Sequence, residues 1–248
     1  MKVNLLGHTQ LAKELTYDFE EYEMTCIGEA LATPSTEQAT DGQVIALAAI
    51  RQCYSHKTAL EVLETESEKY FGDRGQEGKR LFNHIVKSGH TSTLEHINFT
   101  FTVEGVSRAL LAQLTRHRQL SFSVQSQRYN KFSSDSRSGG FDYVVPETVE
   151  GNKNEVVEMV FSDIMENIQG YYDLLIKLGI PQEDARSVLP NAATCNLVTS
   201  GNLRAWLEFY KKRKKGEGAQ AEIAEFAGHI KNAIVEVEPW VNEYFNLT

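Results

Sequence analysis

The strongest constraint on the fold lies in residues 98–120, where a strand pattern runs directly into a helix pattern. Residues 98–103 read Asn-Phe-Thr-Phe-Thr-Val and alternate strictly between polar and apolar side chains. This alternation predicts a strand with one apolar face. Residues 105–120 then place Val106, Leu110, Leu114 and His117 at helical spacing, which predicts a helix.

Further elements follow from apolar periodicity and from stop signals at Gly and Pro. Helices are expected at residues 9–19, 41–55, 79–87, 155–178, 182–189, 202–212 and 219–245, the last with a break at Pro239. Short strands are expected at 2–6 and 141–145, a charged surface excursion at 64–78 and a loop at 133–140. The fold class is therefore α+β, helix-rich with a small central sheet.

Composition narrows the functional classes. The 248 residues include 25 basic and 34 acidic side chains, for a net charge of −9, which argues against a nucleic-acid-binding surface. Cys26, Cys53 and Cys195 are too few and too widely spaced for a disulfide framework. The chain starts without the apolar stretch of a signal peptide and has no run of membrane-spanning length. A cytoplasmic protein without membrane contact is the expectation.

Residues 116–129 concentrate hydrogen-bond donors in this acidic chain. A solvated helix face would explain any one arginine, but not the group. On a continuous helix Arg116 and Arg118 would point about 200° apart, so either the helix ends near Arg116 or the two serve different ligands or subunits. Ser126 and Arg128 are two positions apart. In an extended chain they share a face and can hold one phosphate.

Two other segments are candidates for ligand contact. His90, Glu95 and His96 lack the spacing of a helical zinc motif, so no metal site is expected and a polar, ligand-contacting loop is preferred. Asn202 opens a helix, where an N-cap role is the simple interpretation, although free amides there also favour anions. Glycine-rich phosphate loops are absent from the sequence. A flavin or nucleotide would therefore be held by Arg, Ser and helix ends.

The spacing Arg116-His117-Arg118, seven residues, Ser126, one residue, Arg128 resembles the signature of flavin-dependent thymidylate synthases, the ThyX family. The resemblance extends to Gly89-His90 with Leu94-Glu95-His96, to Arg186-Ser187-Val188-Leu189-Pro190, to Asn202-Leu203-Arg204 and to Arg213, and it covers most of the chain. It implies a ThyX-like fold with a single domain over residues 1–248. It also implies a homotetramer with sites built between subunits.

The resemblance further implies a methyltransferase that converts dUMP to dTMP. Its cofactor would be FAD, with NADPH and methylenetetrahydrofolate as co-substrates and no enzyme nucleophile. The residues implied to bind dUMP are Gln113, Leu114, Thr115, Arg116, Val124, Gln125, Ser126, Gln127, Arg128, Arg186 and Arg213. The residues implied to bind FAD are His90, Ser92, Arg116, His117, Arg118, Val124, Asn202, Leu203, Arg204 and Glu208. Arg213 is also the implied catalytic residue, beside the uracil, where it favours ionisation of N3.

Two positions depart from the family pattern. Val124 stands where Glu or Gln is frequent, so a polar contact is lost or moved. Glu208 stands where Asn is frequent, and an acid there disfavours a reduced, anionic flavin unless it is turned away. Cys195 is expected to be a buried structural residue rather than a nucleophile.

Two rival functions stay open at this point. One is a non-catalytic nucleotide or single-stranded RNA binder, disfavoured by the acidic balance and by the few aromatic residues in the donor-rich segment. The other is a flavoenzyme that acts on a different pyrimidine nucleotide, which Val124 leaves open. Flavin absorbance of the purified protein would separate the first rival from the enzyme.

Overall fold

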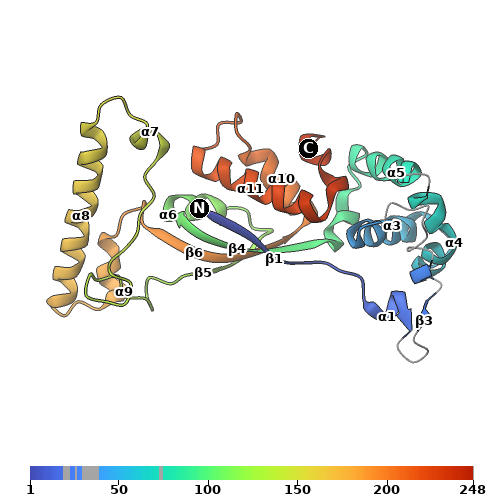
Figure 1. The fold of residues 1–248 in the computed structure, drawn as a ribbon, viewed down its shortest axis with the longest axis horizontal. Helices are drawn as coiled ribbons and strands as arrows, with labels where there is room; N and C mark the ends of the chain where they lie inside the picture. Colours follow the sequence, from blue (N-terminus) through green and yellow to red (C-terminus); the bar gives the residue numbers. More distant parts are fainter. Residues whose placement is uncertain (19–22, 26, 30–38, 73–74, 248) are drawn as a thin grey trace. The chain divides into compact units, whose positions relative to one another are not determined.

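A computed structural model of the chain describes residues 1–18, 23–25, 27–29, 39–72 and 75–247 (Figure 1). Helices dominate the described part, which also contains a four-stranded sheet of order β1-β4-β6-β5. The strands of this sheet are β1 (Lys2–His8), β4 (Asn98–Ser107), β5 (Ser121–Val124) and β6 (Thr194–Asn202). A smaller pair, β2 (Tyr17–Asp18) and β3 (Glu23–Met24), is antiparallel. The predicted α+β class is confirmed.

The predicted alternating strand is confirmed as β4, which extends to Ser107. Its apolar positions are buried, with Phe99, Phe101 and Val103 at 0% exposure, while the polar positions between them lie on the other face. β5 pairs antiparallel with β6, placing Phe122 opposite Thr199. β1 lies at the sheet edge, as predicted for residues 2–6.

Residue contacts divide the chain into two compact units. Unit 1 comprises residues 1–4, 101–200 and 213–227, and unit 2 comprises residues 5–100, 201–212 and 228–248. The single domain implied for residues 1–248 remains a prediction.

Unit 1 contains α6 (Arg108–Leu114), α7 (Glu147–Glu150), α8 (Val156–Lys177), α9 (Gln182–Ala185) and η3 (Arg186–Val188). α8 contacts α7, α9 and η3. Tyr172 of α8 is fully buried in a small core with Phe132 and Ala185, and its hydroxyl accepts a hydrogen bond from the Phe132 N–H at 3.2 Å. This core fixes α9 and η3 beside α8.

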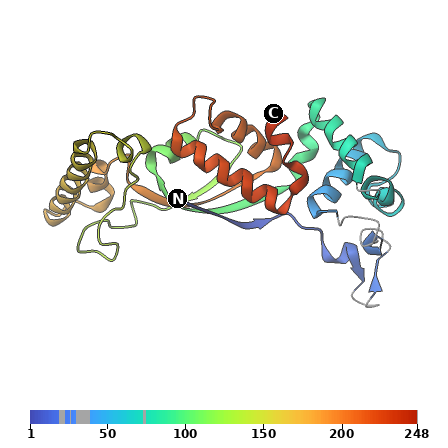
Figure 2. The ribbon, with the colours of Figure 1, turned by 45° about the horizontal axis from the view of Figure 1, so that its top comes forward.

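Unit 2 contains a set of helices that follow one another in the chain. They are α3 (Asp41–Tyr54), α4 (Ala59–Phe71), α5 (Gln76–Lys87) and η2 (Thr91–His96), preceded by α1 (Lys13–Thr16). α4 contacts α3 and α5 (Figure 2). Thr40 and Thr58 begin α3 and α4 with capping boxes completed by Gln43 and Glu61, so the two helix starts are encoded locally.

The C-terminal helices follow the predicted pattern. They are α10 (Leu203–Arg213), α11 (Ala221–Val237), η4 (Pro239–Val241) and α12 (Tyr244–Leu247). The break expected at Pro239 is confirmed, since η4 begins at that residue. The helices predicted at 41–55, 79–87 and 155–178 are confirmed as α3, α5 and α8, whereas the helix predicted at 182–189 is divided into α9 and η3.

The helix predicted over residues 105–120 is wrong at both ends. Gly105 has a φ of 69° and β4 continues to Ser107, so the helix starts at Arg108. Ser107 is the N-cap, and its hydroxyl accepts from the Leu110 N–H at 3.0 Å. Past Leu114 the chain turns tightly, with the His117 N–H bonded to the Leu114 carbonyl at 3.0 Å. The helix therefore ends before Arg116, one of the alternatives left open above.

Three further expectations are wrong in part. Residues 64–78 were expected as a surface excursion, yet α4 runs to Phe71 and buries Ser67, Tyr70 and Phe71, because its charged residues occupy the opposite face of an amphipathic helix. The helix expected at 9–19 is reduced to α1, and Phe19 lies outside the described residues. The strand expected at 141–145 is a single bridge between Tyr143 and Ala193. β6 was not predicted.

Candidate functional site

The predicted site residues fall into two groups, one in each unit, and each group is described by itself. The residues expected to bind dUMP all belong to unit 1, together with His117 and Arg118. The remaining residues expected to bind FAD belong to unit 2 and are His90, Ser92, Asn202, Leu203, Arg204 and Glu208.

In unit 1 the end of α6 presents a polar edge. Leu114 is fully buried, so its side chain anchors the helix. Gln113 precedes it and donates from Nε2 to Gln220 Oε1 at 2.5 Å, while the exposed Thr115 bonds back to the Leu111 carbonyl at 3.0 Å. Gln220 was not singled out as a site residue, because no sequence spacing links it to Gln113.

Arg213 is joined to the signature segment. Its Nε donates to His117 Nε2 at 3.1 Å, and its Nη2 donates to the Gln113 carbonyl at 3.4 Å. In this geometry His117 Nε2 acts as an acceptor, which requires that this nitrogen carries no proton. The last residue of α10 and the middle of the Arg-His-Arg motif thus form one cluster.

Arg116 and Arg118 are exposed on either side of His117. Neither guanidinium group forms an ion pair or a hydrogen bond with the residues that the structure describes. Two uncompensated cations in an acidic chain are suited to an anionic ligand, because the guanidinium fork matches phosphate and carboxylate geometry.

The segment after the motif returns as β5 and is tied to β6. Val124 is opposite Leu197 in the β5–β6 pairing. Gln125 extends this pairing, since its N–H donates to the Asn196 carbonyl at 2.8 Å and its Oε1 accepts from the Asn196 N–H at 3.3 Å. The side-chain oxygen of Gln125 is therefore engaged within the protein, whereas its amide group is left as a donor.

The extended face proposed for Ser126 and Arg128 is wrong, because Gln127 and Arg128 lie in a turn. Ser126 Oγ accepts from the Arg128 N–H at 3.1 Å, and its carbonyl accepts from the Asn130 N–H at 3.1 Å. A Ser side chain that bonds to the backbone two residues ahead stabilises a turn in preference to an extended strand. The two residues remain neighbours through this turn.

Arg128 and Arg186 meet at Glu183. Arg128 Nε is 2.6 Å from Glu183 Oε2, and Arg186 Nε donates to the Glu183 carbonyl at 2.9 Å. Gln182 Nε2 also donates to the Arg128 carbonyl at 2.6 Å. The Arg128 and Glu183 side chains are 57% and 44% exposed, so their ion pair is screened and contributes little stability. An anion can replace Glu183 at Arg128 at small cost.

In unit 2 the start of α10 forms the second group. Asn202 Oδ1 accepts from the Ala205 N–H at 2.9 Å, which confirms its predicted N-cap role. Leu203 is fully buried, and its N–H donates to the Ile97 carbonyl at 2.7 Å. This bond links the start of α10 to the residue before β4.

Arg204 is held between two carboxylates. Its Nη1 is 2.6 Å from Glu95 Oε1 and its Nε is 3.1 Å from Glu208 Oε1. The hydrogen bonds to Glu95 and then to Glu208 raise the pKa of Arg204. Glu208 is thus turned toward Arg204, which neutralises its charge. Glu95 was quoted in the family resemblance but was not predicted as a site residue.

The loop before β4 carries the rest of the unit 2 group. His90 and Ser92 are exposed, and His90 Nδ1 lies 3.2 Å from the Tyr54 hydroxyl. Tyr54 also contacts the His90 ring edge to face, with centroids 6.3 Å apart. Tyr54 therefore orients a predicted flavin-contacting ring from the end of α3, a role that the sequence did not indicate.

Cys195, the cysteine weighed as a nucleophile, is buried at 1% exposure. Burial raises the pKa of the Cys195 thiol, which lowers its thiolate fraction and its reactivity. The described residues contain no group of three or more His, Cys, Asp or Glu able to hold a metal ion. None of the described helices is long and apolar enough to cross a membrane.

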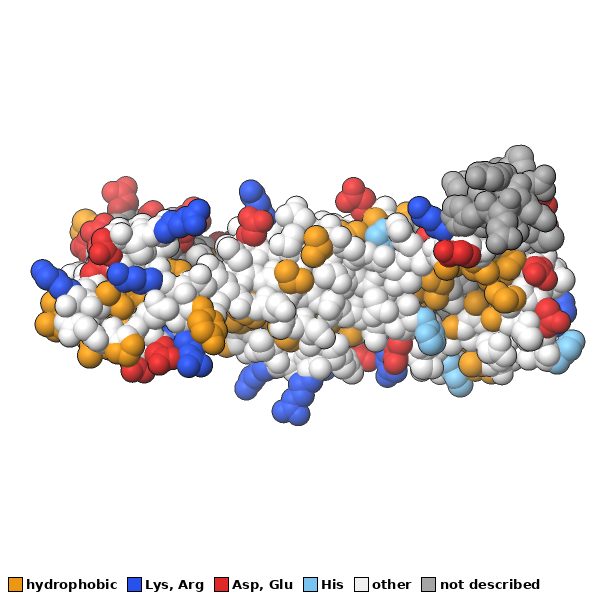
Figure 3. All heavy atoms as spheres, turned by 90° about the horizontal axis from the view of Figure 1, so that it is seen from below, with side chains coloured by type: hydrophobic (Ala, Val, Ile, Leu, Met, Phe, Trp, Pro, Cys, Tyr) orange, Lys and Arg blue, Asp and Glu red, His pale blue; other side chains and the backbone are white. Residues whose placement is uncertain are grey.

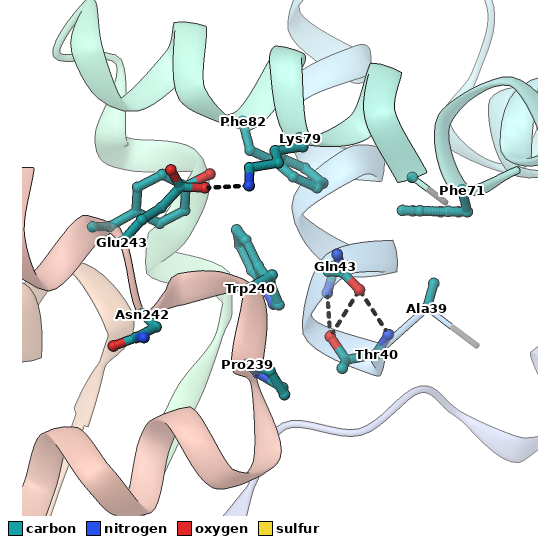
Figure 4. A pocket seen from close by; sticks show the side chains of 12 residues that line it. Ala39, Thr40, Gln43, Phe71, Lys79, Phe82, Pro239, Trp240, Asn242 and Glu243 are labelled. Atoms are coloured by element: carbon teal, nitrogen blue, oxygen red, sulfur yellow. Dashed lines mark hydrogen bonds and ion pairs between the residues drawn. The ribbon is translucent and has the colours of Figure 1, made fainter. Parts of the chain in front are cut away.

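The cavities differ in their relation to the predicted site. A cavity of about 520 Å³ in unit 2 is lined by Phe71, Phe82 and Trp240, with Lys79 Nζ 3.8 Å from Glu243 Oε1 at its side (Figure 4). The described residues around it include none of the predicted site residues. A cavity of about 510 Å³ in unit 1 is lined by Gln125 and Asn196, among others.

Comparison with solved structures identifies the class of fold. The UMP/dUMP methylase PolB from Streptomyces cacaoi, bound with 5-Br dUMP, matches with a TM-score of 0.68 at 19% identity over 99% of this chain and 94% of that chain. ThyX from Helicobacter pylori, complexed with FAD and dUMP, matches with a TM-score of 0.63 at 22% identity over 99% and 98%. The chain has the fold of these pyrimidine-nucleotide enzymes.

Sequence comparison identifies the family. The family described as "Thymidylate synthase complementing protein" matches residues 36–240. The flavin-dependent thymidylate synthase of Geobacter sulfurreducens is 37% identical over 209 residues, covering 84% of this chain and 82% of that protein. A probable flavin-dependent thymidylate synthase of Mycobacterium phage D29 is 38% identical over 174 residues, 66% of this chain and 71% of that protein. The chain belongs to the family of flavin-dependent thymidylate synthases.

Proposed function

We propose that this protein converts dUMP to dTMP by reductive methylation, with methylenetetrahydrofolate as the carbon donor and NADPH-reduced FAD as the source of hydride. Family membership supports the reaction. The observation that carries it to this chain is the bond of Arg213 Nε to His117 Nε2 at 3.1 Å. This bond unites the family signature with the residue implied to act on the uracil.

The nucleotide is assigned to unit 1. Its phosphate is bound by Arg128, Arg186 and Ser126, because Arg128 binds the exposed Glu183 carboxylate and Arg186 binds the main-chain carbonyl of the same residue. The uracil lies beside Gln113 and Arg213, because the Arg213 guanidinium donates to the main-chain carbonyl of Gln113. The full proposed set for dUMP is Gln113, Leu114, Thr115, Arg116, Val124, Gln125, Ser126, Gln127, Arg128, Arg186 and Arg213.

The described residues fit FAD as the resident cofactor. Arg116 and Arg118 offer cations without a protein partner among the described residues, which suits a pyrophosphate. Arg204 is less available, since Glu95 and Glu208 already bind it. The proposed set for FAD is His90, Ser92, Arg116, His117, Arg118, Val124, Asn202, Leu203, Arg204 and Glu208. When bound, FAD supplies the hydride chemistry that no side chain provides.

The protein contributes orientation and charge. Arg213 donates toward N3 of the uracil and favours its ionised form, because a fixed guanidinium group stabilises developing negative charge in a site shielded from water. His117 holds the Arg213 guanidinium at Nε and the Gln113 carbonyl holds it at Nη2, which leaves Nη1 to donate to a ligand. Cys195 takes no part, since it is buried and its pKa is raised.

The functional unit is proposed to be a homotetramer with sites built between subunits. α8 exposes a series of apolar side chains at 46–63% of their surface, namely Val156, Met159, Val160, Ile164, Tyr171 and Leu174. An uncovered apolar stripe of this kind supports burial against another chain. The second group of site residues, in unit 2, is then available to complete sites formed with other copies.

The proposed surroundings are the cytoplasm, without nucleic-acid or membrane partners. The described cysteines Cys53 and Cys195 are free thiols, in keeping with a reducing compartment. Basic and acidic side chains are interspersed among the described residues on the face drawn in Figure 3, which is unlike the basic stripe of a nucleic-acid binder.

A second candidate is methylation of another pyrimidine nucleotide. Val124 in place of the frequent Glu or Gln removes a polar side chain from the nucleotide set, and PolB, which has the same fold, is a UMP/dUMP methylase. Parallel assays with UMP and dUMP decide between the two: UMP turnover comparable with that of dUMP would favour this second candidate.

Flavin binding is the first experimental test of the proposal. The purified protein should show flavin absorbance, or should bind added FAD with a change in its fluorescence. Addition of dUMP to the FAD-loaded protein should then perturb the flavin spectrum, because both ligands occupy one composite site. A protein that leaves FAD fluorescence unchanged would refute the proposed function.

A further inference from the structure

Arg108 contacts the nucleotide-binding segment without belonging to any of the sets assigned above. It is the first residue of α6, and its backbone N–H donates to the Ala193 carbonyl at 3.0 Å. Its Nη2 donates to the Gln125 carbonyl at 2.7 Å. Gln125 immediately precedes Ser126, so Arg108 reaches the backbone from which the proposed phosphate-binding turn begins.

Arg108 binds the chain at the residue where the pairing between β5 and β6 ends. β5 finishes at Val124, and the bond from the Gln125 N–H to the Asn196 carbonyl extends the pairing to Asn196. Beyond it, Ser126 and Arg128 belong to a turn stabilised from within. The Gln125 carbonyl is thus the position at which a hydrogen bond from another element can fix the direction in which the turn leaves β5.

The position of Arg108 is itself fixed from two sides. Ser107, its neighbour, donates from its N–H and its hydroxyl to the two carboxylate oxygens of Glu222 at 2.7 and 2.5 Å. At the other end of α6, Gln113 bonds to Gln220 at 2.5 Å. The start of α11 therefore holds both ends of α6, and a donor placed on α6 has a defined location.

The burial of the Arg108 guanidinium lowers the stability of the folded protein. Arg108 Nε is buried and has no hydrogen-bond partner among the described residues, and the guanidinium lies close enough to influence the buried Cys195 thiol. A buried donor without a partner destabilises a fold. The short bond from Arg108 to one carbonyl offsets part of that penalty and indicates a geometric role at that carbonyl.

We propose that Arg108 is a positioning residue for the nucleotide, acting through the Gln125 carbonyl to hold Ser126 and Arg128 in their binding geometry. This inference rests on the proposed function, because it assigns the turn to dUMP. It predicts an effect on nucleotide binding that is larger than any effect on flavin binding, since the hydrogen bonds of Arg108 go to Ala193 and Gln125, neither of which is assigned to FAD.

The test compares Arg108→Met and Arg108→Lys with the native protein, each loaded with FAD. Met keeps much of the side-chain volume and removes the donors, whereas Lys keeps a cation and one donor direction. Arg80→Met is the matched control, because the Arg80 side chain is 81% exposed and forms an ion pair with the neighbouring Glu77 at 3.5 Å. Calorimetric titration with dUMP, FAD retention, the thermal midpoint and the split between KM and kcat are measured for each.

The loss of one hydrogen bond that positions a charged group should raise the Kd for dUMP about tenfold in Arg108→Met. Arg108→Lys should recover most of this loss, and Arg80→Met should match the native protein. The FAD Kd should change by less than about threefold, a small fraction of the nucleotide effect. An effect confined to KM for dUMP would agree with this geometry.

Other outcomes separate the inference from the proposed function. A native protein that binds FAD but not dUMP refutes the assigned nucleotide site. A native protein that binds dUMP, with Arg108→Met binding it equally well, overturns the role of Arg108 alone. Parallel losses of dUMP and FAD affinity that follow the thermal midpoint would also overturn it. If Arg108→Met does not fold, Glu222→Gln is measured in its place, because it weakens the bonds from Ser107 that fix the start of α6. Unchanged dUMP affinity in Glu222→Gln would then overturn the role of Arg108.

Discussion

At the residue scale, Arg213 and Arg128 illustrate how one side-chain type is placed for two tasks. Arg213 is half-buried and bonded to His117, whereas the Arg128 guanidinium is exposed and is held by a screened ion pair to Glu183 and by a contact over the Tyr129 ring. A fixed guanidinium group can act on a transition state, because its orientation is already set. A loosely paired one can exchange its partner for a phosphate.

Arg213→Ala should therefore lower kcat more than it raises KM for dUMP. Ionisation of uracil N3 matters most as the transition state forms, so the lost interaction belongs mainly to the chemical step. Steady-state kinetics with saturating FAD provide the measurement. A change confined to KM would show that Arg213 is another anchor for the substrate, and the mechanistic role would then be withdrawn.

Arg128→Ala should show the opposite pattern. The expected cost in dUMP binding is roughly 1.5–3 kcal/mol, the value for a hydrogen bond to a charged group, and it should appear in KM. Glu183→Gln is the matched control: it removes the competing carboxylate and should leave dUMP binding unchanged or slightly tighter. Normal KM in Arg128→Ala would remove this residue from the phosphate site.

At the element scale, the N-terminus of α3 is tied to the end of α11 by a buried carboxylate. Glu238 is 1% exposed, and it accepts from the Gly42 N–H at 3.0 Å, from Trp240 Nε1 at 2.5 Å and from the Thr40 hydroxyl. Burial raises its pKa above the ordinary value of 4.5, against the opposing effects of these hydrogen bonds and of His8. Desolvation of the charged form outweighs its partners here.

This raised pKa has a defined effect on stability. A carboxyl group whose pKa is higher in the folded state binds its proton more tightly when folded, so its contribution is present below pH 4.5 and lost as pH rises through the folded pKa. Relative to Glu238→Gln, the native protein should lose unfolding free energy over that interval. Denaturant titrations of both proteins at several pH values measure the difference. A difference that stays constant with pH would contradict the raised pKa.

The elements also show how far sequence reasoning extends. Where local signals agreed, as in the strict alternation of β4 or the capped start of α3, the elements were predictable. The helix expected at 105–120 began too early because Val106 lies at helical spacing from Leu110, and only the cap at Ser107 and the left-handed Gly105 decide between strand and helix. β6 was missed because its partner β5 is distant in sequence, so no local pattern identifies the pairing.

The site was predictable to a different degree. The motif spacing identified Arg116, His117, Ser126 and Arg128. The partners of the site residues were not identified: Glu183 pairs with Arg128, Glu95 with Arg204 and Gln220 with Gln113, each across more than 50 residues of chain. The turn at Ser126 depends on a side-chain bond to the Arg128 N–H, which a pattern of alternating residues does not reveal.

At the scale of the whole molecule, the account predicts assembly. The exposed apolar side chains of α8 and the proposed sites between subunits call for closed symmetry. Light scattering at micromolar concentration should give a homotetramer of about 110 kDa, four times the 27.9 kDa chain. Ile164→Glu on α8 should weaken that assembly, while Arg80→Glu on an exposed surface should not. A native monomer would remove the argument for composite sites.

The central claim is a methyl transfer to dUMP that depends on flavin. The most direct measurement is tritium release from dUMP labelled at C5, because replacement of that hydrogen is inseparable from methylation there. With FAD, NADPH and methylenetetrahydrofolate present, the protein should release tritium. Omission of the folate should abolish the formation of dTMP. Arg213→Ala should reduce the rate strongly. A protein that binds FAD and dUMP yet releases no tritium in the complete mixture would contradict the account.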